Sequence, residues 1–192
     1  VRKDQKIEGQ FAPHRLVMVE SEKWLVLSLA ARRVLDRLEI EHMLHAGLEN
    51  GRLPCTFDDF EMAGVRRQSI GPAIRELVAA GFVEVAKRGS RAWADVPGRA
   101  SEYRLTYVLT PAAGPTDEWD VDTEKHRSYL AWLSTAEGSA RSADLLQIRK
   151  VRERIEEKRK ARCKKTPDTV SQAHPNRVAA GCSSDTTAPG AD

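Results

Sequence analysis

Residues 53–107 carry two helix signals joined by a glycine and then two β-rich runs, and this order constrains the fold more than any other feature of the chain. Thr56 suits a helix N-cap, and Asp59 three residues later predicts a near capping box. Gly64 permits the backbone reversal of a tight turn, and Gly81 suits a left-handed C-cap. Between these glycines, a second helix is predicted by one apolar stripe of Ile70, Ile74, Leu77 and Val78.

The two β-rich runs predict a hairpin with a long, basic connection. We expect strands over 82–87 and 102–107, because apolar and polar residues alternate in the second run. The connection holds four cations, which are Lys87, Arg88, Arg91 and Arg99. A basic loop suits contact with phosphate or with the minor groove of DNA, so these cations are candidate DNA-binding residues. Trp93, in the same loop, either packs back on the domain or contacts the sugar backbone.

The second helix also has a polar side. A helical wheel places Gln68, Pro72 and Arg75 opposite the apolar stripe. Arg pairs with guanine edges and Gln with adenine edges, so this surface suits a major groove, although an ordinary core helix with a solvated face has the same pattern. Residues 64–91 hold six basic and two acidic residues, whereas the whole chain has a net charge of only +3. The positive charge is therefore local, as expected for one phosphate-facing surface.

The rest of the chain is organised around this segment. We interpret it as an N-terminal arm over 1–11, an α+β domain over 12–108, a linker over 109–122, a basic helical extension over 123–165 and a disordered tail over 166–192. Within the domain we expect a short strand at 16–19 and a brief helix capped by Ser21. A longer helix capped by Ser28 should run to about Ala46 and bury Ala31, Val34, Leu35 and Leu38. A turn at Asn50-Gly51 and a further strand follow.

Two helices are expected beyond the linker, over 123–136 and 139–165. The second holds ten basic and three acidic residues between 149 and 165. It is either a phosphate-binding or self-associating helix, or a solvated helix held by pairs such as Arg152–Glu156 and Glu156–Lys160.

Several classes of protein are excluded or disfavoured. No apolar run is long enough for a membrane span, and no apolar signal-peptide core follows the N-terminus. The cysteines, Cys55, Cys163 and Cys182, form no C-x-x-C pair, which favours a reducing, cytoplasmic environment. Nothing assembles a nucleophile, a base and an oxyanion donor, so we expect no enzyme and no cofactor. Glu39-x-x-His42 has the spacing of di-iron bundles but no second copy, and we expect His42 and His45 to close a helix rather than bind metal.

Four stretches, over 29–42, 50–54, 73–85 and 103–106, together resemble a group of bacterial winged-helix proteins. The group looks similar to the DNA-binding halves of phage and plasmid replication proteins, and Ala73-Ile-Arg-Glu-Leu-x-x-x-Gly-Phe also resembles MarR-type and GntR-type regulators. The resemblance covers about residues 12–108. Carried over residue by residue, it implies DNA contact for Arg66, Arg67, Gln68, Ser69, Arg75, Arg88 and Arg91.

One position departs from this resemblance. Arg66 stands where such helices usually begin with a Ser, Thr or Asn cap. If Ser69 is the cap instead, Pro72 becomes the third helical residue and loses no hydrogen bond.

We therefore expect an α+β winged helix-turn-helix domain with a basic helical extension. The expected function is sequence-specific binding of double-stranded DNA, as a transcriptional regulator or a replication-initiation protein of a plasmid or phage type of element. A homodimer is compatible with this reading. The alternatives are a winged-helix protein–protein adaptor and an RNA-binding protein that uses the basic helix.

Overall fold

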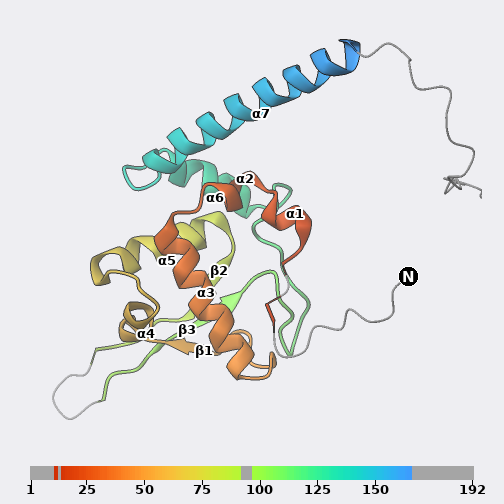
Figure 1. Cartoon of the computed structure of the whole chain (residues 1–192). Coiled ribbons are helices and arrows are strands. Elements are labelled where there is room, and N and C mark those ends of the chain that lie inside the picture. Colours follow the sequence, from red (N-terminus) through yellow and green to blue (C-terminus); the bar gives the residue numbers. More distant parts are fainter. Residues whose placement is uncertain (1–10, 13, 92–96, 166–192) are drawn as a thin grey trace, which may run out of the picture. The chain divides into compact units, whose positions relative to one another are not determined.

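A computed structural model describes residues 11–12, 14–91 and 97–165 (Figure 1). The chain divides into two units, residues 1–150 and 151–192, and the fold described below is that of the first unit. The elements are α1 (Leu16–Val19), α2 (Glu22–Leu25), α3 (Leu29–Leu44), β1 (Leu53–Cys55), α4 (Phe57–Met62), α5 (Arg67–Ala80), β2 (Val83–Lys87), β3 (Ser101–Leu105), α6 (Lys125–Leu133) and α7 (Ser139–Lys165). This composition confirms the α+β class. The second unit contributes residues 151–165, which continue α7.

The segment at 16–19 is helical, so the expected strand there is wrong. The amides of Met18 and Val19 both donate to the carbonyl of Arg15, at 3.0 and 3.1 Å. Met18 is fully buried, whereas Leu16 and Val17 are exposed. A strand would alternate buried and exposed residues along the whole run, whereas here two exposed residues precede buried Met18 and half-buried Val19, as a single helical turn allows.

The helices α2 and α3 form as expected. The Ser21 hydroxyl accepts from the amide of Trp24 at 3.3 Å, and that of Ser28 accepts from the amide of Ala31 at 3.1 Å. Each cap satisfies a backbone donor that the first turn leaves unpaired. The expected buried face of α3 is confirmed, with Ala31, Val34, Leu35 and Leu38 all buried. The helix ends at Leu44, slightly earlier than expected.

The pair of helices α4 and α5 follows the local signals closely. The capping box between Thr56 and Asp59 is present, and Gly64 turns the chain with a φ of +83°. The helix α5 begins at Arg67, and Arg66 occupies the cap position without a side-chain hydrogen bond. The alternative start at Ser69 is therefore wrong. Pro72 lies inside the helix, where it has no N–H to donate to the carbonyl four residues earlier.

The buried face of α5 is rotated slightly from the predicted stripe. Its fully covered positions are Ile70, Ala73, Leu77 and Ala80, and Glu76 is buried beside them. Ile74 and Val78 are only half-buried. The carboxylate of Glu76 accepts from the amide and the hydroxyl of Ser28, both at 2.7 Å, and so joins α5 to the start of α3. The helix ends at Gly81 with a φ of +85°, as predicted.

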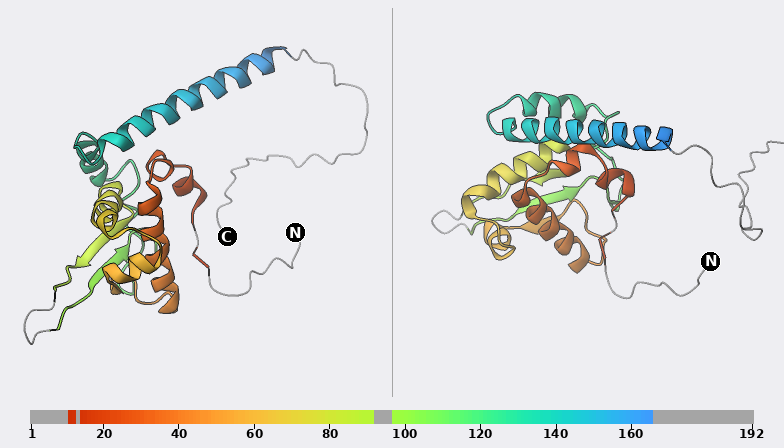
Figure 2. Two further views of the ribbon diagram at one scale, coloured as in Figure 1. Left: turned by 60° about the vertical axis from the view of Figure 1, so that its left-hand side comes forward. Right: turned by 45° about the horizontal axis from the view of Figure 1, so that its top comes forward.

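Three antiparallel strands form a sheet in the order β1-β3-β2. Leu53 pairs with Tyr103, and Val83 pairs with Leu105. The side chain of buried Asn50 donates to the carbonyl of Leu105 and accepts from its amide, both at 2.8 Å. Asn50, expected only as a turn residue, therefore holds the loop before β1 to β3. The helices α3 and α5 pack against each other over this sheet (Figures 1 and 2).

Residues 88–91 and 97–100, which we call the hairpin arms, extend beyond the helices (Figures 1 and 2). Ser90 and Arg99 pair as an isolated bridge, with hydrogen bonds of 3.0 and 2.9 Å. The amide of Gly89 donates to the Ser101 hydroxyl at 3.0 Å. Trp93 lies outside the described residues, as do residues 1–10 and 166–192.

The core continues past residue 108, where the sequence suggested a domain boundary. Trp119, in the segment read as a linker, is buried and stacks on Phe82 at a centroid distance of 6.4 Å. The Thr106 hydroxyl donates to the carbonyl of Gly81 at 2.6 Å. Tyr129 and Leu133 from α6, with Leu145 from α7, join the same core cluster. The helices α6 and α7 lie within the ranges expected for them. Trp119 and the ion pair between Arg104 and Glu118 attach the intervening segment to the sheet domain.

Candidate nucleic-acid interface

The exposed side of α5 carries most of the helical residues that the sequence singled out. Arg66, Arg67, Gln68 and Arg75 are exposed, and Ser69 is half-buried. They occupy this side because Ile70, Ala73 and Leu77 hold the opposite side in the core. The structure therefore brings the predicted helical candidates together on one surface.

Arg67 is engaged by acidic residues of the preceding helix. Its Nη1 lies 2.7 Å from Oδ1 of Asp58, and it also donates to the carboxylate of Glu61. The hydrogen bonds to Asp58 and Glu61 raise the pKa of Arg67 above its ordinary value. The guanidinium lies 5.9 Å from the ring centroid of Phe57. The guanidinium of Arg67 is therefore already paired with two acids of α4.

Arg75 is engaged by an acid distant in sequence. Its Nε and Nη2 donate to the two carboxylate oxygens of Glu137, at 2.9 and 2.5 Å. Such fork-like pairing is the geometry by which an arginine also recognises phosphate or a guanine edge. The hydrogen bond from Arg75 lowers the pKa of Glu137, which lies in the loop between α6 and α7. Glu137 thus occupies the two nitrogens that form this fork.

The hairpin arms hold the cations that are least engaged. Lys87 lies 3.6 Å from a carboxylate oxygen of Glu102. Within the part of the chain that the structure describes, no ion pair involves Arg88, Arg91 or Arg99, and Arg66 at the start of α5 is likewise unpaired. All four are exposed.

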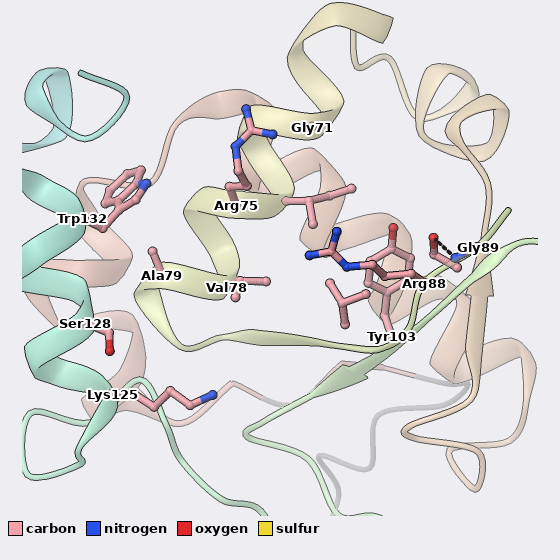
Figure 3. Close-up of a pocket in the computed structure, with 13 residues that line it drawn as sticks. Gly71, Arg75, Val78, Ala79, Arg88, Gly89, Tyr103, Lys125, Ser128 and Trp132 are labelled. Atoms are coloured by element: carbon pink, nitrogen blue, oxygen red, sulfur yellow. Dashed lines mark hydrogen bonds between the residues drawn. The ribbon is translucent and has the colours of Figure 1, made fainter. Parts of the chain in front are cut away.

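Two hollows join the arms to the helices. The first, which we call the α5–α6 hollow, has a volume of about 770 Å³. Figure 3 shows Arg75 on α5, Arg88 beyond β2, and Lys125, Ser128 and Trp132 on α6 around it. Its apolar wall includes Ile74, Val78, Val85 and Tyr103. The indole Nε1 of Trp132 is buried without a hydrogen-bond partner.

The second hollow, the α4–arm hollow, has a volume of about 600 Å³. Arg67 lines it from α5, and Arg91 and Arg99 line it from the arms. The two hollows share Gly89 and Ser101. Five predicted residues thus line two hollows that meet at the base of the arms, and these residues are Arg67, Arg75, Arg88, Arg91 and Arg99.

Sequence reasoning missed Glu137 and the wall provided by α6. The pairing of Arg75 with Glu137 spans 62 positions, so no local pattern reveals it. A signal for α6 did exist, because Tyr129 and Trp132 in a short polar helix require an apolar surface to pack against. The acids of α4 were visible, but Asp58 and Glu61 were not assigned to Arg67.

Glu39 and His45, two of the residues that suggested a metal, have other partners. The Glu39 carboxylate accepts from the Tyr107 hydroxyl and lies 2.6 Å from Nε2 of His14. Nε2 of His45 lies 3.1 Å from Glu41. Burial lowers the pKa of His42. Among the described residues, no group of three or more His, Cys, Asp and Glu side chains could hold a metal ion.

Across the described ranges, no helix has both the length and the apolar character needed to cross a bilayer. Comparison of the chain with family models, with curated proteins and with solved structures found no match.

Proposed function

We propose that this chain is a winged-helix protein that binds double-stranded DNA. The sheet order β1-β3-β2, with α4 and α5 between β1 and β2, supports this reading. In it, α5 is the reading helix and the hairpin arms are the wing. The observation that carries the proposal is the convergence of helix and arm arginines on two adjoining hollows.

The distribution of free and paired cations suggests a division of roles. Arg88, Arg91 and Arg99 lie on an extended hairpin and are exposed, so they suit contact with phosphate or the minor groove. Gln68 and Arg75 project from α5, where bidentate contacts with base edges are made. Sequence-specific binding of this kind fits a transcriptional regulator or a replication initiator of a plasmid or phage type of element.

A protein-docking role is the second candidate. The apolar wall of the α5–α6 hollow, which includes Ile74, Val78 and Trp132, favours it. A duplex presents phosphates and base edges, whereas a peptide could fill this apolar side. A chain that binds no duplex at low salt would support docking and contradict the proposal.

The test is fluorescence anisotropy of the full chain with a random-sequence duplex and with a duplex selected from genomic fragments. Affinity should fall linearly with the logarithm of salt concentration, with a slope of about 0.9 per phosphate contact. Combined Arg88→Ala and Arg91→Ala should weaken binding to both duplexes and flatten the slope by roughly one to two units. Exposed Arg52 lines a different hollow, so Arg52→Ala is the matched control and should behave as wild type.

Arg75→Ala separates reading from positioning. It should relax base preference at one position by about 1–3 kcal/mol and leave binding to the random duplex nearly unchanged. Loss of sequence preference in the arm variants, with Arg75→Ala unchanged, would instead make the hairpin the reading element. Competition by structured RNA in the same assay tests binding through the basic part of α7.

A further inference from the structure

A separate cavity of about 280 Å³ lies on the side of α6 that carries Tyr129, and we call it the Lys23 cavity. Its floor is buried and consists of Lys23, Trp119, Tyr129 and Leu145. Its rim is exposed and apolar, with Val17, Val121 and Leu130. The cavity thus has an apolar entrance and a polar group at its floor.

Three polar atoms at this cavity are buried without hydrogen bonds. They are Nζ of Lys23, Oη of Tyr129 and Nδ1 of His126. Six such side-chain atoms occur among the described residues, and half of them therefore line one small space. Buried polar groups in folded proteins are nearly always hydrogen-bonded, because an unmet donor costs free energy. The donors of Lys23 and Tyr129 thus lack acceptors among the described residues, and both face the same cavity.

Nζ of Lys23 has no hydrogen-bond partner among the described residues, and the carboxylate of Asp120 acts on its charge without a hydrogen bond. The side chain of Lys23 is only 3% exposed, and its ammonium lies 5.1 Å from the ring centroid of Tyr129. Glu22, which also lines the cavity, is held by the guanidinium of Arg149 through contacts of 3.0, 3.1 and 2.6 Å. Asp120 accepts from the amide of Asp122 at 3.3 Å. Nζ of Lys23 makes no hydrogen bond to either acid among the described residues.

We propose that the Lys23 cavity binds a small organic carboxylate. An ammonium offers three donors and a phenol one, and a carboxylate offers about four acceptor positions on two oxygens. The carboxylate head would lie between Lys23 and Tyr129, and the apolar body would lie against Trp119, Leu130 and Leu145. The volume is just below the roughly 300–1,000 Å³ of pockets for drug-sized ligands, so the ligand is smaller than these.

The protonation states agree with this head group. Burial raises the pKa of Tyr129 to about 12, so the phenol remains a donor. Burial lowers the pKa of Lys23 to about 8, against a raising effect of Asp120. Burial also lowers the pKa of His126. The other charged groups at the cavity, Glu22 and Arg149, are paired with each other. Carboxylate affinity should therefore fall as the pH rises through about 8, where Lys23 loses its proton.

The experiment is calorimetric titration of the full chain with benzoate and hexanoate at pH 7, with benzamide as a neutral control of similar shape. Both carboxylates should bind saturably, and benzamide should bind about tenfold more weakly or not at all, because a charge-assisted bond is lost. Lys23→Met should abolish carboxylate binding. Lys158→Met, on an exposed position of α7, should leave it unchanged.

A second variant keeps the test independent of the stability of Lys23→Met. Tyr129→Phe retains the ring and removes one donor, so it should weaken benzoate binding severalfold. Circular dichroism checks that each variant is folded. Equal binding of benzoate and benzamide, absence of saturable binding by either carboxylate, or unchanged benzoate affinity in folded Lys23→Met would overturn the proposal.

Discussion

Replacing Lys23 with methionine should stabilise the protein at neutral pH. The ammonium is buried and unpaired, and burial lowers its pKa from 10.5 to about 8. One pKa unit corresponds to about 1.4 kcal/mol, so a charged Lys23 costs the folded state about 3 kcal/mol. Methionine has a similar unbranched chain without the charge, and it can fill the same space.

The pH dependence of this difference has a definite sign. The folded-state pKa lies below the unfolded one, so between pH 8 and 10.5 the unfolded state binds more protons at this group. The unfavourable contribution of Lys23 is complete below pH 8 and decreases as the pH rises toward 10.5. The stability advantage of Lys23→Met should therefore be largest at pH 7 and shrink over this window.

Urea unfolding of wild type and variant at a series of pH values, followed by circular dichroism, measures the difference. Other groups that titrate in this range, such as tyrosines, contribute equally to both proteins and cancel. Lys158→Met removes an exposed charge and should change stability by less than about 0.5 kcal/mol. A Lys23→Met protein that is less stable than wild type at pH 7, or an advantage that does not change with pH, would refute the reasoning.

Three further perturbations test other parts of the structure. A Cβ at Gly81 would lie 2.3 Å from the carbonyl oxygen of Glu118, whereas a Cβ at Gly47 would meet only a side chain, at 3.7 Å. Gly47→Ala should lower the free energy of unfolding in urea by roughly 1–2 kcal/mol, the cost of a left-handed backbone, and Gly81→Ala should lower it by more. Equal losses in the two variants would mean that residues 118–119 do not pack against Gly81. Glu137→Gln should tighten binding to the selected duplex in anisotropy assays, because it removes the charged partner that holds Arg75; unchanged affinity for that duplex would mean that Arg75 does not contact it. Burial raises the pKa of the Cys55 thiol to about 12, so iodoacetamide at pH 8 should modify Cys55 only after the protein unfolds. Mass spectrometry detects the modification, and rapid labelling of the native protein would contradict the burial of Cys55.

The elements with local signals were predictable from the sequence. The caps at Ser21, Ser28 and Thr56 act within one helical turn, so their residue types alone announce the helices. The first residue and the buried face of α5 were harder to predict. Pro72 is compatible with more than one helix start, and the half-buried Ile74 is compatible with more than one rotation of the helix about its axis. The run at 16–19 was misread because four consecutive apolar residues have no period.

The candidate sites were less predictable, because they are assembled by tertiary packing. The cations of the interface were visible as a charge excess, but the engagement of Arg75 by Glu137 depends on how α6 and α7 return to α5. Trp119 looked like part of a linker, since Gly114 and Pro115 precede it and its stacking partner Phe82 lies far away in sequence. The Lys23 cavity draws residues from α2, α6, α7 and the segment at 119–121, and no sequence pattern marks such a combination.

The helix α6 lines two separate spaces, the α5–α6 hollow and the Lys23 cavity. Lys125, Ser128 and Trp132 border the α5–α6 hollow, and His126 and Tyr129 border the Lys23 cavity. This helix has nine residues and presents different side chains to the two spaces. Thermodynamic linkage then requires reciprocity: an occupant of the Lys23 cavity that changes the affinity for an occupant of the α5–α6 hollow has its own affinity changed by the same factor.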